Sequence, residues 1–289
     1  MTSLPAPSPW TAALPEANPP EGMALYQLPT GTYDTRAALA VRGGSFRDKR
    51  HFAANAVLVT HPGGDFLIDA GFGEQVDEHV KMLPLFTRAP YTKTTTVYEQ
   101  LVRAGYDFTR LRGVILTHSH WDHSSGLDSL DVPIWINKGE REYAAKDGDG
   151  KVFRTVSVGH KIHEYVFGGP AYLGFAKSFD VYGDGSLVIA LAGGHTTGSV
   201  VVFVTLPSAS PVASGKRYAF IGDLTWQYDG IKRRAERPWL LRTLADSDAG
   251  QVREGIVLAA ALVDVMRVVP AHDVGAYDGI PVLPRVMPS

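Results

Sequence analysis

The densest group of chemically capable residues in this 289-residue chain is the run His118-Ser119-His120-Trp121-Asp122-His123. Alternate residues at the end of a strand point to the same side, so His118 and His120 can face one cavity. Asp122 and His123 can approach that cavity after the chain turns. A divalent first-row metal takes three or four nitrogen or oxygen ligands of these kinds. The run therefore predicts a metal site, and ordinary polar loop residues are the less favoured interpretation.

Further candidate ligands follow short apolar strands expected along the rest of the chain. Strands predicted at 187–191, 218–221 and 265–269 are followed closely by His195, Asp223 and His272. A scaffold places functional side chains in loops at strand ends, so we expect these residues to meet the first run. Taken singly, a histidine after a strand could equally be structural. Five histidines and two aspartates together would be enough for two neighbouring metals with one bridging carboxylate.

The elements that must position these residues alternate between strands and helices. Residues 55–69 form two apolar runs around a Pro-Gly-Gly-Asp turn, which predicts a β-hairpin. A buried strand is expected at 114–116, directly before the histidine run, and helices are expected at 94–104 and 251–262. This pattern predicts an α/β architecture in which helices cover sheets. A short turn between strands is expected at 207–215.

Composition narrows the function classes. The chain is 45% hydrophobic and 20% charged with a net charge of −2, which allows a large core and argues against a nucleic-acid binder or a polybasic membrane anchor. It has no cysteine, which excludes disulfides, thiolate metal ligands and a cysteine nucleophile. Residues 1–22 lack a signal-peptide pattern and predict a loosely ordered N-terminal arm before a domain at 23–289. We therefore expect a cytoplasmic protein without a membrane-spanning segment, which could form a homodimer.

The motifs resemble those of the metallo-β-lactamase superfamily, in the order that the family uses. Thr117–His123 matches its HxHxDH motif, and Asp69-Ala70-Gly71 resembles its early Asp-x-Gly element. The segments around His195, Asp223 and His272 resemble its later ligand motifs. The resemblance implies a single-domain, four-layer αββα sandwich holding two divalent metals, with zinc expected and iron, manganese or cobalt as alternatives. It implies a first metal at His118, His120 and His195, a second at Asp122, His123 and His272, and Asp223 as the bridge.

The resemblance also implies a chemistry. Two metals share a water, lower its pKa and create a bridging hydroxide, so no protein nucleophile is needed. Asp122 is expected to orient this nucleophile and carry its proton, and Asp223 to hold both metals. Asp69 is expected to hold a ligand histidine in place, although capping a turn is an equal alternative.

Elimination within the superfamily favours a hydrolase of lactones or related esters. Branches with a cysteine ligand are excluded, and the helical, flavin or nucleic-acid-binding additions of other branches are not visible. The remaining resemblance is to the N-acyl-homoserine lactonase-like group. One position departs from it, because Trp226 stands where those lactonases often have a tyrosine. A metallo-hydrolase of β-lactams or phosphotriesters, and a redox or non-catalytic metal protein on this fold, stay open as alternatives.

Apolar residues near the motifs suggest a small-molecule substrate with an apolar portion, although core packing is an equal alternative for each. The segments 72–91 and 165–179 are expected to form walls, the second as a loop covering the substrate. A basic run at 232–234 could attract an anion, but a solvated loop is the favoured interpretation. The pocket candidates are Phe72, Leu83, Phe86, Trp121, Phe175 and Trp226.

Overall fold

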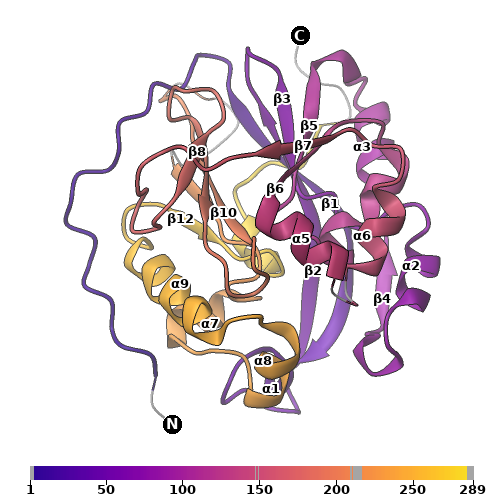
Figure 1. Cartoon of the computed structure of the whole chain (residues 1–289), viewed down its shortest axis with the longest axis vertical. Helices are drawn as coiled ribbons and strands as arrows, with labels where there is room; N and C mark the ends of the chain where they lie inside the picture. The colour runs from indigo at the N-terminus through magenta and orange to yellow at the C-terminus, as the bar shows by residue number, and fades with distance from the viewer. Residues whose placement is uncertain (1–2, 147, 149, 209, 211–216, 285–289) are drawn as a thin grey trace.

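Two β-sheets pack face to face, and helices lie on the outer side of each (Figure 1). The computed structural model describes residues 3–146, 148, 150–208, 210 and 217–284. In that part of the chain the first sheet contains seven strands and the second contains five. The strands of the first sheet are, in spatial order, β4 (Tyr91–Lys93), β1 (Ala24–Arg36), β2 (Lys49–Thr60), β3 (Asp65–Ile68), β5 (Leu111–Ile115), β6 (Ile134–Asn137) and β7 (Ile162–Tyr165).

The second sheet comes mostly from the C-terminal half of the chain. Its strands are, in spatial order, β12 (Arg267–Val269), β11 (Arg217–Phe220), β10 (Val200–Thr205), β9 (Leu187–Leu191) and β8 (Ser178–Asp180). The side chains of β10 show that both faces of this sheet are covered. Val200, Val202 and Val204 pack between the two sheets, whereas Val201 and Phe203 pack under the outer helices. Every residue of this strand is buried, as expected for a strand covered on both faces.

Helices complete the four layers. The helices beside the first sheet are α2 (Val76–Met82), α3 (Val97–Arg103), α4 (Trp121–Ser124), α5 (Lys138–Lys146) and α6 (Lys151–Val156). The helices beside the second sheet are α7 (Tyr228–Arg233), α8 (Trp239–Ala245) and α9 (Ala249–Ala261), and the short α1 (Ala37–Ala40) lies near α8 (Figure 1). Separate hydrophobic clusters fill the spaces between successive layers. The predicted αββα sandwich is confirmed.

Strand direction explains how the candidate ligands reach one place. β3 and β5 are parallel, so Asp69 and the histidine run leave the first sheet at the same edge. β11 and β12 are also parallel, so Asp223 and His272 leave the second sheet together. Carboxyl ends of parallel strands are the usual location of functional sites in open α/β sheets. The fold therefore brings loops distant in sequence to one end of the sandwich.

Most local predictions are confirmed. The hairpin at 55–69 is β2 and β3, which pair antiparallel around a turn where Gly64 has φ +103°. The helix predicted at 94–104 is α3, which begins with a capping box between Thr96 and Glu99. The helix at 251–262 is α9. The predicted turn at 207–215 lies largely outside the described residues.

The N-terminal arm has no helix or strand over residues 3–20. It runs along the side of the second sheet (Figure 1), where Leu4, Trp10 and Leu14 pack against the outer core of that sheet. The Arg217 guanidinium donates a hydrogen bond of 3.0 Å to the Pro15 carbonyl. Among the described residues, no helix has the length and apolar character needed to cross a membrane.

Candidate metal centre and active site

Three buried histidines form the first group of candidate ligands. His118 and His120 follow β5, and His195 follows β9. The Nδ1 atom of His120 lies 3.1 Å from Nε2 of His118 and 3.0 Å from Nε2 of His195. Ligands about 2.0–2.1 Å from a tetrahedral zinc lie about 3.3 Å from one another. The spacing of these three nitrogen atoms therefore fits one metal ion.

A second group lies beside the first. It consists of Asp122 and His123, both in the short helix α4, and His272 after β12. Nε2 of His272 lies 3.3 Å from Nε2 of His123 and 3.4 Å from Oδ2 of Asp122. All three side chains are buried. This spacing also fits one metal ion.

Asp223 stands between the two groups. Its Oδ1 lies 3.0 Å from Nε2 of His272 and 3.4 Å from Nε2 of His123. Its Oδ2 lies 3.4 Å from Nε2 of His195 and 3.9 Å from Nε2 of His118. One oxygen therefore faces each group, which is the arrangement a bridging carboxylate needs. The residue before Asp223 is Gly222, which has φ +50°. It packs so closely against Thr117 that a Cβ added to Gly222 would lie 3.0 Å from the Thr117 Cβ.

Hydrogen bonds at the other ring nitrogen orient three of these histidines. Nδ1 of His123 lies 2.8 Å from Oδ2 of Asp69, Nδ1 of His195 lies 3.0 Å from Oδ1 of Asp246, and Nδ1 of His272 lies 2.7 Å from the Ala53 carbonyl. In each ring, the hydrogen bond at Nδ1 leaves Nε2 facing the other candidate ligands. Such partners fix the ring orientation of metal-binding histidines and make them more basic.

Electrostatics keep His118 and Asp223 in the protonation states that suit a cation. Burial, reinforced by the neighbouring His123 and His120, holds the pKa of His118 well below its usual value, which favours the neutral ring that a metal requires. Burial alone would raise the pKa of Asp223, but His272 and His123 outweigh it and hold this pKa well below its usual value. The buried carboxylate is therefore ionised.

Asp69 lies where the sequence suggested that a ligand-holding carboxylate would be. Besides contacting His123, its Oδ1 accepts a hydrogen bond of 2.7 Å from the Thr117 backbone N–H. Its own backbone has φ +56°, an unusual conformation for a residue other than glycine. Strain of this kind persists only where surrounding structure enforces it, and it is common at functional sites.

Glu140, on α5, is a buried carboxylate that the sequence interpretation missed. Its Oε1 accepts hydrogen bonds of 2.7 Å from both the backbone N–H and the hydroxyl of Ser119. Its Oε2 accepts from the Thr196 hydroxyl and, at 3.2 Å, from the Gly198 N–H. Glu140 therefore ties the loop of His118 and His120 to the loop of His195. No motif marks it, because its role depends on two loops that meet only in the fold.

Arg237 is a second buried residue that the sequence did not indicate. Its guanidinium donates to Oδ1 of Asp246 at 2.6 Å and to the backbone carbonyl of Asp223. It also lies over the Trp226 ring, 4.6 Å from the ring centroid. Burial would raise the pKa of Asp246, but Arg237 and His195 outweigh this effect and lower it. Asp246 is therefore an ionised acceptor for the His195 ring.

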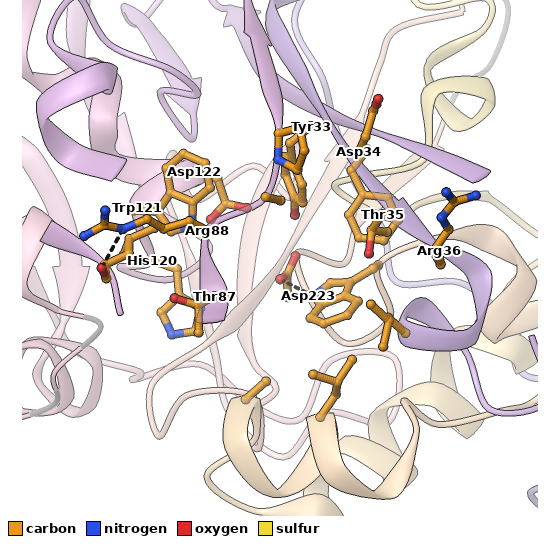
Figure 2. A pocket seen from close by; sticks show the side chains of 18 of the residues that line it. Tyr33, Asp34, Thr35, Arg36, Thr87, Arg88, His120, Trp121, Asp122 and Asp223 are labelled. Carbon is orange, nitrogen blue, oxygen red and sulfur yellow. Dashed lines mark hydrogen bonds between the residues drawn. The ribbon is translucent and has the colours of Figure 1, made fainter. Parts of the chain in front are cut away.

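A cavity of about 620 Å³ opens above the candidate ligands (Figure 2). Asp122, His120, His195 and Asp223 form part of its lining. Besides Leu83, Trp121 and Trp226, its other lining residues come from the ends of β1 and β2, from α1, from the segment 87–90 and from α8. Of these four regions, the sequence interpretation had included the segment 87–90 and had not considered β1, the start of β2, α1 or α8.

The predicted pocket residues divide into two sets. Leu83, Trp121 and Trp226 line the cavity. Phe72 instead lies fully buried behind the wall and stacks on Trp121, with ring centroids 5.3 Å apart. Phe175 packs against Phe203 in the outer core of the second sheet.

The loop prediction for 165–179 also differs from the structure. Tyr172, Leu173 and Phe175 of this segment are buried under the second sheet's helices, because their apolar side chains fill its outer core. None of the residues that line the cavity belongs to it among the described residues. The side chain of Phe86, the remaining predicted pocket residue, lies outside the described part of the structure.

Tyr33, near the end of β1, is a cavity residue that the sequence did not single out. Figure 2 shows it beside Asp122 and Asp223. Burial and both carboxylates, including a hydrogen bond to Asp122, hold the pKa of its phenol well above the usual value. The hydroxyl therefore keeps its proton and can donate a hydrogen bond. In the structure this donor is directed at Asp122, just as the Trp226 N–H donates to Oδ2 of Asp223 at 2.7 Å.

The fold and the ligand arrangement define a class of protein. The sequence profile of the metallo-beta-lactamase superfamily matches residues 50–272, which include every candidate ligand. The chain belongs to the metallo-beta-lactamase superfamily and is a hydrolase of that superfamily.

Named relatives and solved structures extend this result. The N-acyl homoserine lactonase AttM of Rhizobium radiobacter is 25% identical over 198 residues, which cover 65% of this chain and 73% of that protein. The structure of an N-acyl homoserine lactone hydrolase with the product N-hexanoyl-L-homoserine at its catalytic metal centre superposes with a TM-score of 0.67 at 17% identity, covering 89% of this chain and 96% of that one. The dizinc quorum-quenching lactonase AidC superposes with a TM-score of 0.61 at 16% identity, covering 89% of each chain.

Proposed function

We propose that this chain is a dinuclear metal-dependent hydrolase of lactones or related esters. The observation that carries the proposal is the position of Asp223, whose two carboxylate oxygens face two separate groups of candidate ligands. A single-metal site would not need a second complete group. The apolar part of the cavity wall supports a small-molecule substrate with an apolar portion.

The donor set decides which ions would suit the site. Imidazole nitrogens and carboxylate oxygens suit zinc, and also accept iron, manganese or cobalt. When bound, two such ions supply an activated water near neutral pH and an electrophile for the scissile carbonyl. His118, His120 and His195 would hold one ion, Asp122, His123 and His272 would hold the other, and Asp223 would contact both.

The chain's own residues would then orient the substrate and manage protons. The Tyr33 hydroxyl lines the cavity beside the two aspartates, and when Asp122 holds a metal ion the hydroxyl would turn from this carboxylate to donate a hydrogen bond to the oxygen on which negative charge develops. Asp122 lies next to this phenol and can receive a proton from the attacking water. Trp226 contributes its apolar ring to the cavity wall, since its N–H is already engaged by Asp223.

The lactone assignment draws on two lines of support. The relatives that match the chain include several named N-acyl homoserine lactonases. A cavity of about 620 Å³ lies within the usual range of small-molecule sites, roughly 300–1,000 Å³.

The test combines metal analysis with a substrate panel. Purified protein would be assayed with a pH indicator against lactones, alkyl esters, β-lactams and phosphotriesters, and its metal content would be measured. Two metal ions per chain with lactone or ester turnover is the expected result. Turnover of β-lactams or phosphotriesters alone would show that these compounds, and not lactones or esters, are the substrate class. Iron with oxygen consumption would indicate a redox protein, and a metal-loaded but inert chain would contradict the proposal.

A further inference from the structure

We propose that the cavity takes a substrate bearing an anionic group, which Arg36 and Lys49 bind at a distance from the metal centre. The inference rests on the proposed function for the reaction itself, but it concerns a part of the cavity that holds no candidate metal ligand. It specifies the substrate class as lactones or esters whose apolar chain ends in a carboxylate or phosphate.

The first support is the strand register. Arg36, the last residue of β1, lies directly opposite Lys49, the first residue of β2, and both line the cavity. Like charges directly opposite on neighbouring strands repel and destabilise the pair. Here the two repelling side chains lie on the wall of the cavity, where a ligand can reach both. An anion between the two side chains would remove the repulsion.

The second support is a contrast with neighbouring cations. Arg50 pairs with Asp48 at 2.7 Å and with Asp229 at 2.9 Å. Other arginines near the cavity are paired as well, including Arg42, Arg237 and Arg242. Within the part of the chain that the structure describes, neither Arg36 nor Lys49 has a side-chain hydrogen bond or ion pair. Local acids thus neutralise the surrounding arginines and leave this cationic pair available.

The remaining charges of the cavity leave the wall positive at this end. Asp34 is the nearby acid, and its carboxylate contacts the His51 ring at 2.8 Å. Arg88 also lines the cavity, but Figure 2 shows it beside Trp121 and His120, away from Arg36, and it donates to the Leu83 and Lys81 carbonyls. Asp122 and Asp223 belong to the metal centre. The basic run at 232–234 does not line the cavity.

Geometry sets the length of the expected substrate. Arg36 lies three residues beyond Tyr33 on β1, which at about 3.3 Å per residue is roughly 10 Å along the strand. Figure 2 shows Tyr33 beside Asp122 and Asp223, with Arg36 well apart from them. Leu39, Leu241 and Leu244 line the same cavity. A substrate that fits would therefore place several methylene groups between its scissile carbonyl and its anionic end.

The test compares binding of charged and neutral ligands that cannot be hydrolysed. Metal-loaded full-length protein would be titrated with γ-lactams carrying alkyl side chains of increasing length that end in a carboxylate, a phosphate or a neutral primary amide. Trp121 and Trp226 line the cavity, so their fluorescence reports binding. The variants are Arg36→Gln, Lys49→Gln and the double substitution. The control is Arg103→Gln with Lys161→Gln, which removes the same charge from exposed positions outside the cavity.

The expected result is that wild-type protein and the control bind the charged lactams about tenfold more tightly than the amide at an intermediate chain length. The double variant should bind charged and neutral lactams equally. High salt should weaken binding of the charged lactams only. The carboxylate and phosphate series identify which anion is preferred.

Two results would overturn the inference. One is equal binding of charged and neutral lactams by wild-type protein. The other is a charge preference that survives the double substitution, which would place the anion elsewhere in the cavity, on the metal centre or on Arg88. Lactone turnover without a charge preference would contradict this inference and leave the proposed function standing. A charge preference lost in the double variant, in a protein that opens no lactone, would remove the proposed function alone.

Discussion

The metal centre and the cavity wall above it are built in different ways. The seven candidate ligands are all less than 10% exposed, and buried partners such as Asp69, Glu140 and Asp246 hold their loops or rings. The wall includes α8, which has no buried residue and leaves Trp239, Leu240 and Leu244 between 55% and 70% exposed. A centre that must hold ligands at fixed distances requires this support. A wall that contacts only the substrate can vary, so substitutions in the two regions should differ greatly in effect.

The largest effect is expected at Asp223. Asp223→Ala removes the carboxylate that faces both ligand groups, so the variant should lose at least one metal ion per chain and about 10³-fold or more in turnover. Metal analysis after dialysis and lactone turnover measure these losses. Asp131→Ala, an exposed aspartate away from the cavity, is the matched control. Retention of both metals and the full rate by Asp223→Ala would disprove the bridging role.

Tyr33 should have the next largest effect. Tyr33→Phe removes the hydroxyl but keeps the ring that packs against Phe52 and Trp121. Loss of one such donor typically lowers kcat by about 10²–10³-fold. Metal content and thermal stability should stay close to wild type, and Tyr98→Phe on α3 provides the control. An unchanged kcat would show that the hydroxyl does not stabilise the transition state and only hydrogen-bonds to Asp122.

Glu140 tests whether the metal centre depends on residues beyond its ligands. Glu140→Gln keeps the side-chain shape but replaces the carboxylate that accepts hydrogen bonds from Ser119 and Thr196 by a neutral amide. Metal affinity of the group containing His118, His120 and His195 should fall about 10–100-fold, with the other group less affected. Competition with a chelator measures both affinities. Glu142→Gln, exposed on the same helix, should change neither, and equal affinities in Glu140→Gln and wild type would refute the role.

Trp226 lies at the boundary of the two regions, and its effect should be smaller and selective. Trp226→Tyr replaces the apolar ring by a phenol at the position where the resembling lactonases often have one. We expect the ratio of kcat/KM for homoserine lactones over simple γ-lactones to rise by about tenfold. Steady-state kinetics on both substrates measure the ratio. A uniform change in both rates would show that this position does not select the substrate.

The smallest effect is expected in α8. Leu244→Ala should change the free energy of unfolding by about 0.5 kcal/mol or less, because the side chain is largely exposed. It should raise KM only for substrates with long apolar chains, by a few-fold. Denaturant unfolding and a chain-length series measure both quantities. A destabilisation comparable to that of a core substitution would show that α8 is part of the folded core.

Local sequence signals predicted the centre better than the wall. The histidine run and the residues at the strand ends predicted a cluster of candidate ligands, because the residue types and their spacing are themselves the signal. The hairpin of β2 and β3 was likewise visible from its apolar runs and turn. Phe72 and Phe175 were misplaced because an aromatic side chain that fills a core has the same local pattern as one that lines a cavity. Only packing between the layers separates the two cases.

Residues that act through tertiary contacts could not be predicted from the sequence. Glu140 is an ordinary helical glutamate until two ligand loops fold around it, and Arg237 meets Asp246 only after α8 is in place. Tyr33 comes from a strand that the sequence interpretation did not identify. Its position beside Asp122 depends on the packing of β1 against α4 and its neighbours.

The most direct test of the account is the rate of lactone hydrolysis measured while metal is added back to metal-free protein. The account predicts that the rate rises with added zinc and reaches its plateau at two equivalents per chain. A plateau at one equivalent, or a rate independent of metal, would contradict the claim that Asp223 joins two metals in one hydrolytic centre.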